Sequence, residues 1–155
     1  MTRRILQVLL GWALAACAQV QAQAPAPEYD FYARGPYAGG VPRPEAVLGY
    51  PVGKRHSYHH QMEAYIHALE KASPRVKVRQ YGESYEGRKT WLVIITSEEN
   101  HKRLEEIRAN VARLRDPRQT GAAEALKLAA ATPAVVWLNY ANDGNESAAF
   151  EAGMQ

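Results

Sequence analysis

Ala134 to Leu138 (Ala-Val-Val-Trp-Leu) form a continuous apolar run, and a polar loop from Asn139 to Glu146 follows it directly. An unbroken apolar run of this length is typical of a β-strand that is buried on both faces. Such a strand needs a neighbour on each of its two edges. We therefore expect this segment to lie inside a sheet.

Two further strands are expected before it. Val76 to Tyr81 alternates well enough for a strand, and Thr90 to Thr96 is rich in β-branched and aromatic residues. Gly82 to Gly87 between them contains turn residues. The two strands therefore predict a β-hairpin, in which Tyr85 to Arg88 forms the turn and Gly87 supplies its unusual backbone angles.

Helices are expected where apolar residues recur three or four positions apart, or where alanine is frequent. Their ranges are Ser57 to Ala72, Ser97 to Arg115, Ala122 to Ala130, and Ser147 to Met154. Ser97 is the predicted N-cap of the second helix, because Glu98 and Glu99 follow it in the first turn.

Three strands do not complete a sheet around an inner strand, and the last helix reaches Gln155 with no stop signal. We expect the chain to be the N-terminal part of a larger domain. A complete small protein with a short terminal helix is the alternative.

The first residues resemble an export signal. Arg3 and Arg4 precede the apolar stretch Ile5 to Ala16, which is shorter than the roughly 20 residues that span a bilayer. Cleavage after Ala22 and lipidation of Cys17, which ends a bacterial lipoprotein-like box, both stay open. We expect residues 1–22 to be a signal peptide, 23–50 a Pro/Gly/Ala-rich linker, and 51–155 the folded part, exported to the periplasm, secreted, or anchored by lipid at the cell envelope.

Charge and cysteine content exclude several classes of site. Without Arg3 and Arg4, the net charge of +3 falls to +1, and no basic run interleaves with aromatic residues. A nucleic-acid partner is therefore not expected, and no protein partner can be inferred from the sequence. Cys17 is the only cysteine, so the mature part has no disulfide or thiolate metal cluster.

Two carboxylates stand out in the loop after the apolar run. Asp143 and Glu146 are three residues apart, at the carboxyl end of a strand, where ligands bind in open α/β sheets. The pair can converge on one cation as the chain turns into a helix. Capping of that helix is the competing interpretation.

Three segments resemble one protein family, in that family's order. They are SPRVKVRQYGESYEGRKTWLVIITSEEN (73–100), LRDPR (114–118) and PAVVWLNYANDGNESAAFEAGM (133–154). From about Pro42 to Met154 the chain resembles the zinc carboxypeptidases, the carboxypeptidase A-like metallopeptidases, and especially an exported bacterial branch. The resemblance implies an α/β fold of three layers, with a mixed central sheet between helices.

The resemblance also implies a metal site. The family's loop usually reads His-Gly-Asn-Glu, and its His and Glu bind one zinc ion together with a second His and a water. By position, Glu146 is the Glu ligand and Asp143 replaces the first His. The second His belongs beyond Gln155. Asn145 either contacts substrate or stabilises the loop.

Replacement of His by Asp leaves two outcomes open. An Asp carboxylate oxygen is attached to Cγ, as is the ring nitrogen that the family's His uses, and zinc accepts carboxylate oxygen at about 2.0–2.2 Å. Two carboxylates, however, neutralise the charge of Zn²⁺, so the bound water is less acidified. Asp143 is therefore either a functional metal ligand or a substitution that accompanies loss of catalysis.

For an active relative, the resemblance implies hydrolysis of a peptide bond near a free C-terminus. The metal activates water, a Glu acts as general base, and an Arg holds the terminal carboxylate. All of these catalytic residues are expected beyond this chain, so the 155 residues are expected to be inactive alone. A zinc deacylase or murein-peptide hydrolase, and an inactive relative that binds peptides or cell-wall fragments, are the alternatives.

Other residues have simpler interpretations. His59, His60 and His67 lie on the first helix, where Glu63 is placed to pair with His67. A solvated polar face is favoured over a second metal site. The tryptophans at 91 and 137 are expected in the core.

Overall fold

The computed structural model describes residues 29–140, 143, 146 and 148–155. The chain divides into two units, residues 1–35 and 36–155. In the described part of the first unit, the Tyr32 backbone N–H donates to Asp30 Oδ1 at 2.8 Å, and the rings of Tyr29 and Phe31 meet edge to face. The predicted signal peptide, with Cys17, and Asn145 of the metal loop lie outside the described residues.

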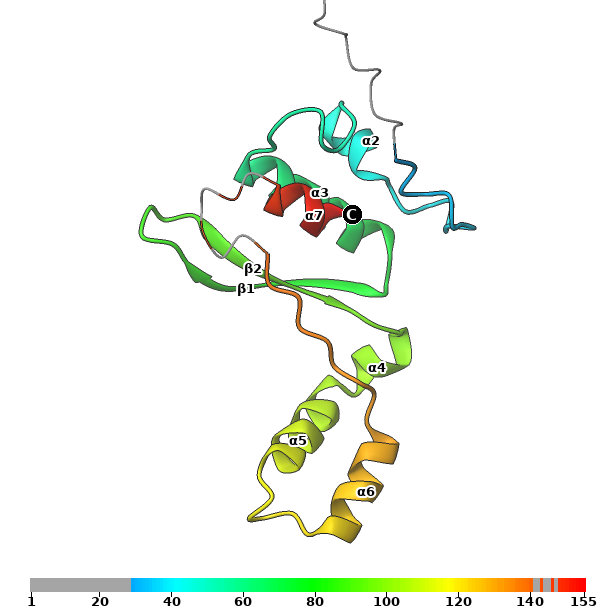
Figure 1. Cartoon of the computed structure of the whole chain (residues 1–155), viewed down its shortest axis with the longest axis vertical. Helices are drawn as coiled ribbons and strands as arrows, with labels where there is room; N and C mark the ends of the chain where they lie inside the picture. Colours follow the sequence, from blue (N-terminus) through cyan, green and yellow to red (C-terminus); the bar gives the residue numbers. More distant parts are fainter. Residues whose placement is uncertain (1–28, 141–142, 144–145, 147) are drawn as a thin grey trace, which may run out of the picture. The chain divides into compact units, whose positions relative to one another are not determined.

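The second unit contains helices and a two-stranded sheet, so the α/β fold class is confirmed (Figure 1). In chain order, its elements are α2 (Pro44–Leu48), α3 (His59–Ala72), β1 (Val76–Glu83), β2 (Lys89–Ile95), α4 (Glu98–Lys102), α5 (Leu104–Arg115), α6 (Ala122–Ala131) and α7 (Ala149–Met154). No helix in the described part of the chain is long and apolar enough to cross a membrane.

The predicted hairpin is confirmed. Strands β1 and β2 pair antiparallel, from Val76 opposite Ile95 to Glu83 opposite Lys89, with one irregularity between Gln80 and Gly82. At the turn, the Ser84 N–H donates to the Arg88 carbonyl at 2.7 Å. Gly87 has a φ of 73° there, a left-handed conformation that glycine adopts without steric cost.

A hydrogen bond from Tyr58, the residue before α3, to a side chain in its first turn stabilises the start of this helix. The Tyr58 N–H donates to Gln61 Oε1 at 3.0 Å, which satisfies one of the free donors that precede a helix. The helix buries Tyr65 and Ile66. Its polar side chains reach the hairpin, since Glu63 accepts from Trp91 Nε1 at 2.9 Å and Glu70 accepts from the Val78 N–H at 2.8 Å.

An apolar cluster joins segments far apart in the sequence. Its buried members are Leu48, Tyr50, Tyr65 and Met154, with Val47, Val52, Met62 and Leu69 packed against them. Leu48 and Tyr50 belong to the range predicted as linker, so packed structure begins before residue 51. Helix α2 forms there because Pro44 starts it and Gly49, with a φ of 77°, ends it.

The segment predicted as one helix from Ser97 to Arg115 is two helices, α4 and α5. Ser97 is the N-cap as predicted, since its Oγ accepts from the Asn100 N–H at 3.2 Å. The break is at Arg103, with φ −121° and ψ 26°. Its guanidinium donates to the carbonyl of Ala131 at 2.9 Å. A tertiary hydrogen bond therefore accompanies a break that the helical periodicity did not reveal.

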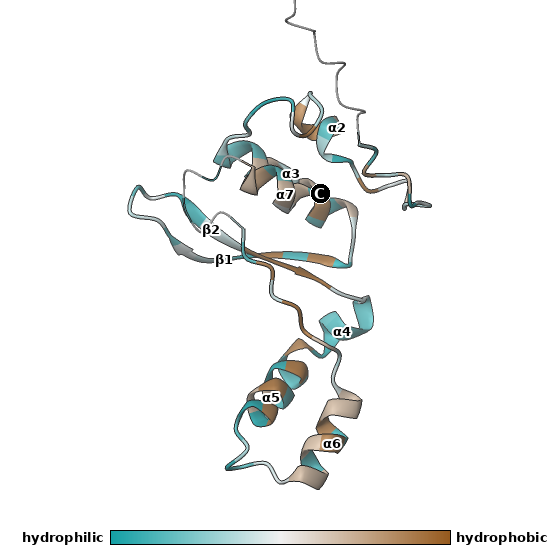
Figure 2. Ribbon diagram, viewed as in Figure 1, coloured by the Kyte–Doolittle hydropathy of each residue, from teal (hydrophilic) through white to brown (hydrophobic). Residues whose placement is uncertain are grey.

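The prediction of a buried strand at Ala134 to Leu138 is wrong. The segment has no strand pairing, and Val135, Val136, Trp137 and Leu138 are between 65% and 77% exposed. Trp137 is therefore not a core residue, although Figure 2 shows how apolar this stretch is. Within the described residues, β1 and β2 pair only with each other, so nothing supplies the neighbours that an inner strand requires.

Helices α5 and α6 contact each other. Arg113 of α5 forms an ion pair with Glu124 of α6, and the buried Thr120 in the connection donates to the Arg113 carbonyl at 2.8 Å. Ile107 is the buried residue of α5. The predicted helix at Ala122 to Ala130 is confirmed and ends one residue later.

Candidate metal-binding loop

The loop that carries the two predicted ligands winds directly into α7. The Glu146 N–H donates to the Asp143 carbonyl at 3.0 Å, and the Ala149 N–H donates to the Glu146 carbonyl at 3.1 Å. These hydrogen bonds join the backbone of Asp143 to that of Glu146, and the backbone of Glu146 to the first residue of α7. Asp143 and Glu146 are both exposed.

A buried polar contact holds the helix that follows this loop. Glu151 of α7 is 7% exposed, and its Oε1 accepts from the backbone N–H of Ser57 at 2.6 Å. Ser57 is completely buried. Met154, one turn further along α7, lies in the apolar cluster. Helix α7 is thus anchored to the segment that enters α3.

Side chains around Ser57 extend this contact into a network. Tyr50 Oη and Ser57 Oγ share a hydrogen bond of 2.9 Å, and Tyr50 Oη also donates to Gln61 Oε1 at 3.1 Å. Gln61 in turn accepts from the Tyr58 N–H. Neither Ser57 nor Glu151 carried a sequence signal for this contact, because a backbone donor has no side-chain signature.

His59 of α3 and His56, which precedes the helix, both make ring contacts with Phe150 of α7, with centroids 6.5 and 6.2 Å away. His59 Nε2 also contacts the carbonyl of Lys89 at 2.9 Å. Across the described residues, no group of three or more His, Cys, Asp or Glu is placed to hold a metal ion.

The predicted pairing of Glu63 with His67 is wrong. Glu63 lies 4.0 Å from His59 Nδ1 and accepts from Trp91, while His67 Nδ1 lies 3.6 Å from Glu70. Residues three apart on a helix are also neighbours, so Glu70 competes with Glu63 for His67. The His67 ring further meets Trp91 edge to face.

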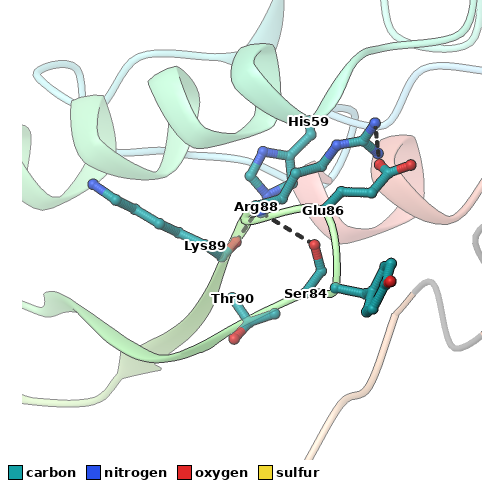
Figure 3. A pocket seen from close by; sticks show the side chains of 7 residues that line it. His59, Ser84, Glu86, Arg88, Lys89 and Thr90 are labelled. Atoms are coloured by element: carbon teal, nitrogen blue, oxygen red, sulfur yellow. Dashed lines mark hydrogen bonds and ion pairs between the residues drawn. The ribbon is translucent and has the colours of Figure 1, made fainter.

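A shallow depression of about 280 Å³ lies at the hairpin turn (Figure 3). Its lining residues come from the turn and from the start of α3: His59, Ser84, Tyr85, Glu86, Arg88, Lys89 and Thr90. Arg88 is already paired with Glu86 at 2.7 Å. The charges of this depression are therefore largely satisfied within the turn itself.

A second depression follows α5, where Asp116 contacts Arg118 through both carboxylate oxygens at 2.8 and 3.1 Å. The Arg118 guanidinium holds the pKa of Asp116 below its ordinary value. The same pair raises the pKa of Arg118. Since Asp116 follows the last residue of α5, this pair stabilises the turn between α5 and α6.

A family model described as zinc carboxypeptidase matches residues 62–152. The chain belongs to the zinc carboxypeptidase family. The match includes the hairpin, the loop with Asp143 and Glu146, and most of α7. No curated protein and no solved structure matches the chain.

The residues of this zinc carboxypeptidase chain fit part of a zinc site. Catalytic zinc sites use three protein ligands of N or O type and leave one position open. Asp143 and Glu146 are two exposed carboxylates whose backbones share a hydrogen bond, and oxygen donors of this kind are acceptable to zinc. A third ligand is not placed with them among the described residues.

Proposed function

We propose that the chain belongs to a metallocarboxypeptidase-type hydrolase, which cleaves a peptide bond near a free C-terminus in a zinc-dependent reaction. The observation that supports this proposal is the family match over residues 62–152, which includes Asp143 and Glu146, two exposed carboxylate residues whose backbones share a hydrogen bond. When bound there, zinc would supply Lewis acidity toward the scissile carbonyl and the attacking water.

Glu146 is the metal ligand in this proposal, and Asp143 is the second. Both are exposed, so a cation and a substrate can approach them. We assign the third ligand, the general base and the group that holds the substrate's terminal carboxylate to polypeptide outside these 155 residues. The 155 residues alone are accordingly expected to show no turnover.

Asp143 favours a second candidate from a different class. An Asp in place of a neutral His adds a negative charge to the ligand set, which lowers the Lewis acidity of a bound zinc. The added oxygen ligand also weakens the preference for zinc over metals that favour oxygen ligands, such as manganese or magnesium. A catalytically inactive relative that binds peptides or cell-wall fragments is consistent with this change. A zinc deacylase or murein-peptide hydrolase is the alternative chemistry at the same loop.

Metal content and turnover of the full gene product separate these functions. We expect about one zinc per chain by elemental analysis, hydrolysis of peptides with a free C-terminus, and loss of both on Glu146→Ala. Glu124→Ala, at an exposed ion pair in α6, is the control and should change neither. A protein without stoichiometric metal that gains metal and activity on Asp143→His would instead support the inactive relative.

We also propose export of the protein, from the basic and apolar residues at its start. Mass spectrometry of the mature N-terminus tests this. A lipid-modified Cys17 indicates a lipoprotein, an N-terminus near Gln23 indicates a cleaved soluble form, and an intact Met1 in exporting cells contradicts export.

A further inference from the structure

Glu151 is a buried carboxylate with an incomplete set of hydrogen bonds. Its Oε1 accepts from the Ser57 N–H, whereas its Oε2 is buried without a hydrogen-bond partner in the described part of the chain. Burial of a carboxylate costs several kcal/mol unless hydrogen bonds or an opposite charge compensate it. An apolar side chain would pack α7 against the cluster at lower cost. Stability alone therefore does not account for a glutamate here.

What the carboxylate adds is a fixed position for α7. A hydrogen bond is directional, and the one from the Ser57 N–H to Glu151 Oε1 measures 2.6 Å. It ends on the backbone of Ser57, whose own Oγ is bonded to Tyr50, at the entrance to the 14-residue helix α3. Apolar packing at Met154 alone would still allow the six-residue α7 to slide or rotate.

Backbone hydrogen bonds lead from the metal loop to the first residue of α7. The Glu146 N–H is bonded to the Asp143 carbonyl, and the Ala149 N–H to the Glu146 carbonyl. Ala149 is the first residue of α7, two positions before Glu151. A movement of α7 relative to Ser57 would therefore act on the hydrogen bonds of Glu146 and, through them, on Asp143.

We propose that Glu151 is a positioning residue for the metal-binding pair Asp143 and Glu146. Its carboxylate fixes α7 to the Ser57 backbone, and α7 holds the turn in which the pair converges on one cation. This inference rests on the proposed function, in which the loop binds zinc. Residues that orient metal ligands typically change metal affinity by about 10- to 100-fold when they are replaced.

The test uses the full-length protein with Glu151→Leu, Glu151→Gln and a control, Ile107→Ala. Leu keeps apolar packing but leaves the Ser57 N–H without its acceptor, and Gln retains an acceptor oxygen. Ile107 is buried in α5, so its truncation destabilises the fold away from α7. Glu151→Asp, which shortens the side chain by one methylene, replaces Leu if the Leu variant does not fold.

Two measurements are made where each variant is fully folded. Amide hydrogen exchange of Glu146 and Ala149, without metal, should be at least about tenfold faster in Glu151→Leu, and zinc affinity in a chelator competition should fall about tenfold. Glu151→Gln should remain close to wild type in both. Ile107→Ala should lower the melting temperature and leave both unchanged.

The inference is overturned if Glu151→Leu has the amide exchange rates and zinc affinity of wild type. It is also overturned if Glu151→Gln changes both as much as Glu151→Leu does, or if Ile107→Ala lowers zinc affinity as much as Glu151→Leu does. A wild-type protein that binds no zinc contradicts the proposed function instead. The exchange rates, which need no metal, then decide separately whether Glu151 holds the loop.

Discussion

The backbone N–H of Ser57 donates a 2.6 Å hydrogen bond to Glu151 across 94 residues of sequence. This contact brings α7 onto the entrance of α3, beside the residues that build the apolar cluster. The loop with Asp143 and Glu146 immediately precedes α7. Helix α7, which follows this loop, is therefore anchored to a part of the chain that precedes β1 and β2 in the sequence.

Tyr50→Phe should lower the free energy of unfolding by about 1–2 kcal/mol. The phenol joins the buried Ser57 Oγ to Gln61, and its loss leaves a buried hydroxyl without that partner. Urea unfolding measures the change. Tyr58→Phe is the matched control, because Tyr58 is 64% exposed. Equal losses in the two variants would show that the Tyr50 network does not contribute.

Glu70→Gln should destabilise the protein by about 1 kcal/mol at neutral pH and by much less near pH 3. The Val78 N–H that bonds to the carboxylate, and to a smaller extent the neighbouring His67, hold the pKa of Glu70 below its ordinary value. Because the folded-state pKa is depressed, this stabilisation is present above the unfolded pKa and is lost as the pH falls through the folded pKa.

Urea unfolding between pH 7 and pH 3 checks this dependence for Glu70. The control is Glu83→Gln, whose side chain is exposed at the end of β1 and accepts only from the neutral amide of Gln80 at 3.3 Å. A destabilisation by Glu70→Gln that stays constant over the pH range would contradict the assignment, since it could not arise from ionisation of the carboxylate.

Gly87→Ala should cost about 1 kcal/mol of stability, because residue 87 has a φ of 73° and an L-residue is strained in that region. The space around the position is open, so the cost comes from the backbone and not from a clash. Gly40→Ala is the control, since Gly40 is not among the glycines with positive φ and the space around it is open, so its replacement should change stability by less than about 0.5 kcal/mol. Similar losses at both sites, measured by thermal unfolding, would argue against the turn conformation.

Val136→Lys should reduce binding of a hydrophobic dye and self-association of these 155 residues, with a change in stability within about 0.5 kcal/mol. Val136 is 77% exposed in an apolar segment. Ala130→Lys adds the same charge at an exposed position of α6 and should not reduce dye binding. A loss of stability well above 1 kcal/mol on Val136→Lys would show that the segment is buried in solution.

Local patterns predicted the elements whose stability is local. The hairpin followed from strand propensity and a turn with Gly87, and the Ser97 cap followed from one side chain and the acidic residues after it. Helix α2 was missed because its five residues carry no helical periodicity. The break at Arg103 was missed because its guanidinium bonds to the carbonyl at the end of α6, a partner far away in sequence.

Composition and motifs by themselves determined the family, the α/β class and the two candidate ligands, since these depend on residue types in a fixed order. Only the tertiary structure decided that the Glu146 N–H meets the Asp143 carbonyl, that Glu151 accepts from the Ser57 N–H, and that Val135 to Leu138 are exposed. The reason is physical. Apolar residues in a sequence show that burial of these side chains is favourable. The residues that bury them depend on the path of the whole chain, and so does the backbone donor that contacts Glu151.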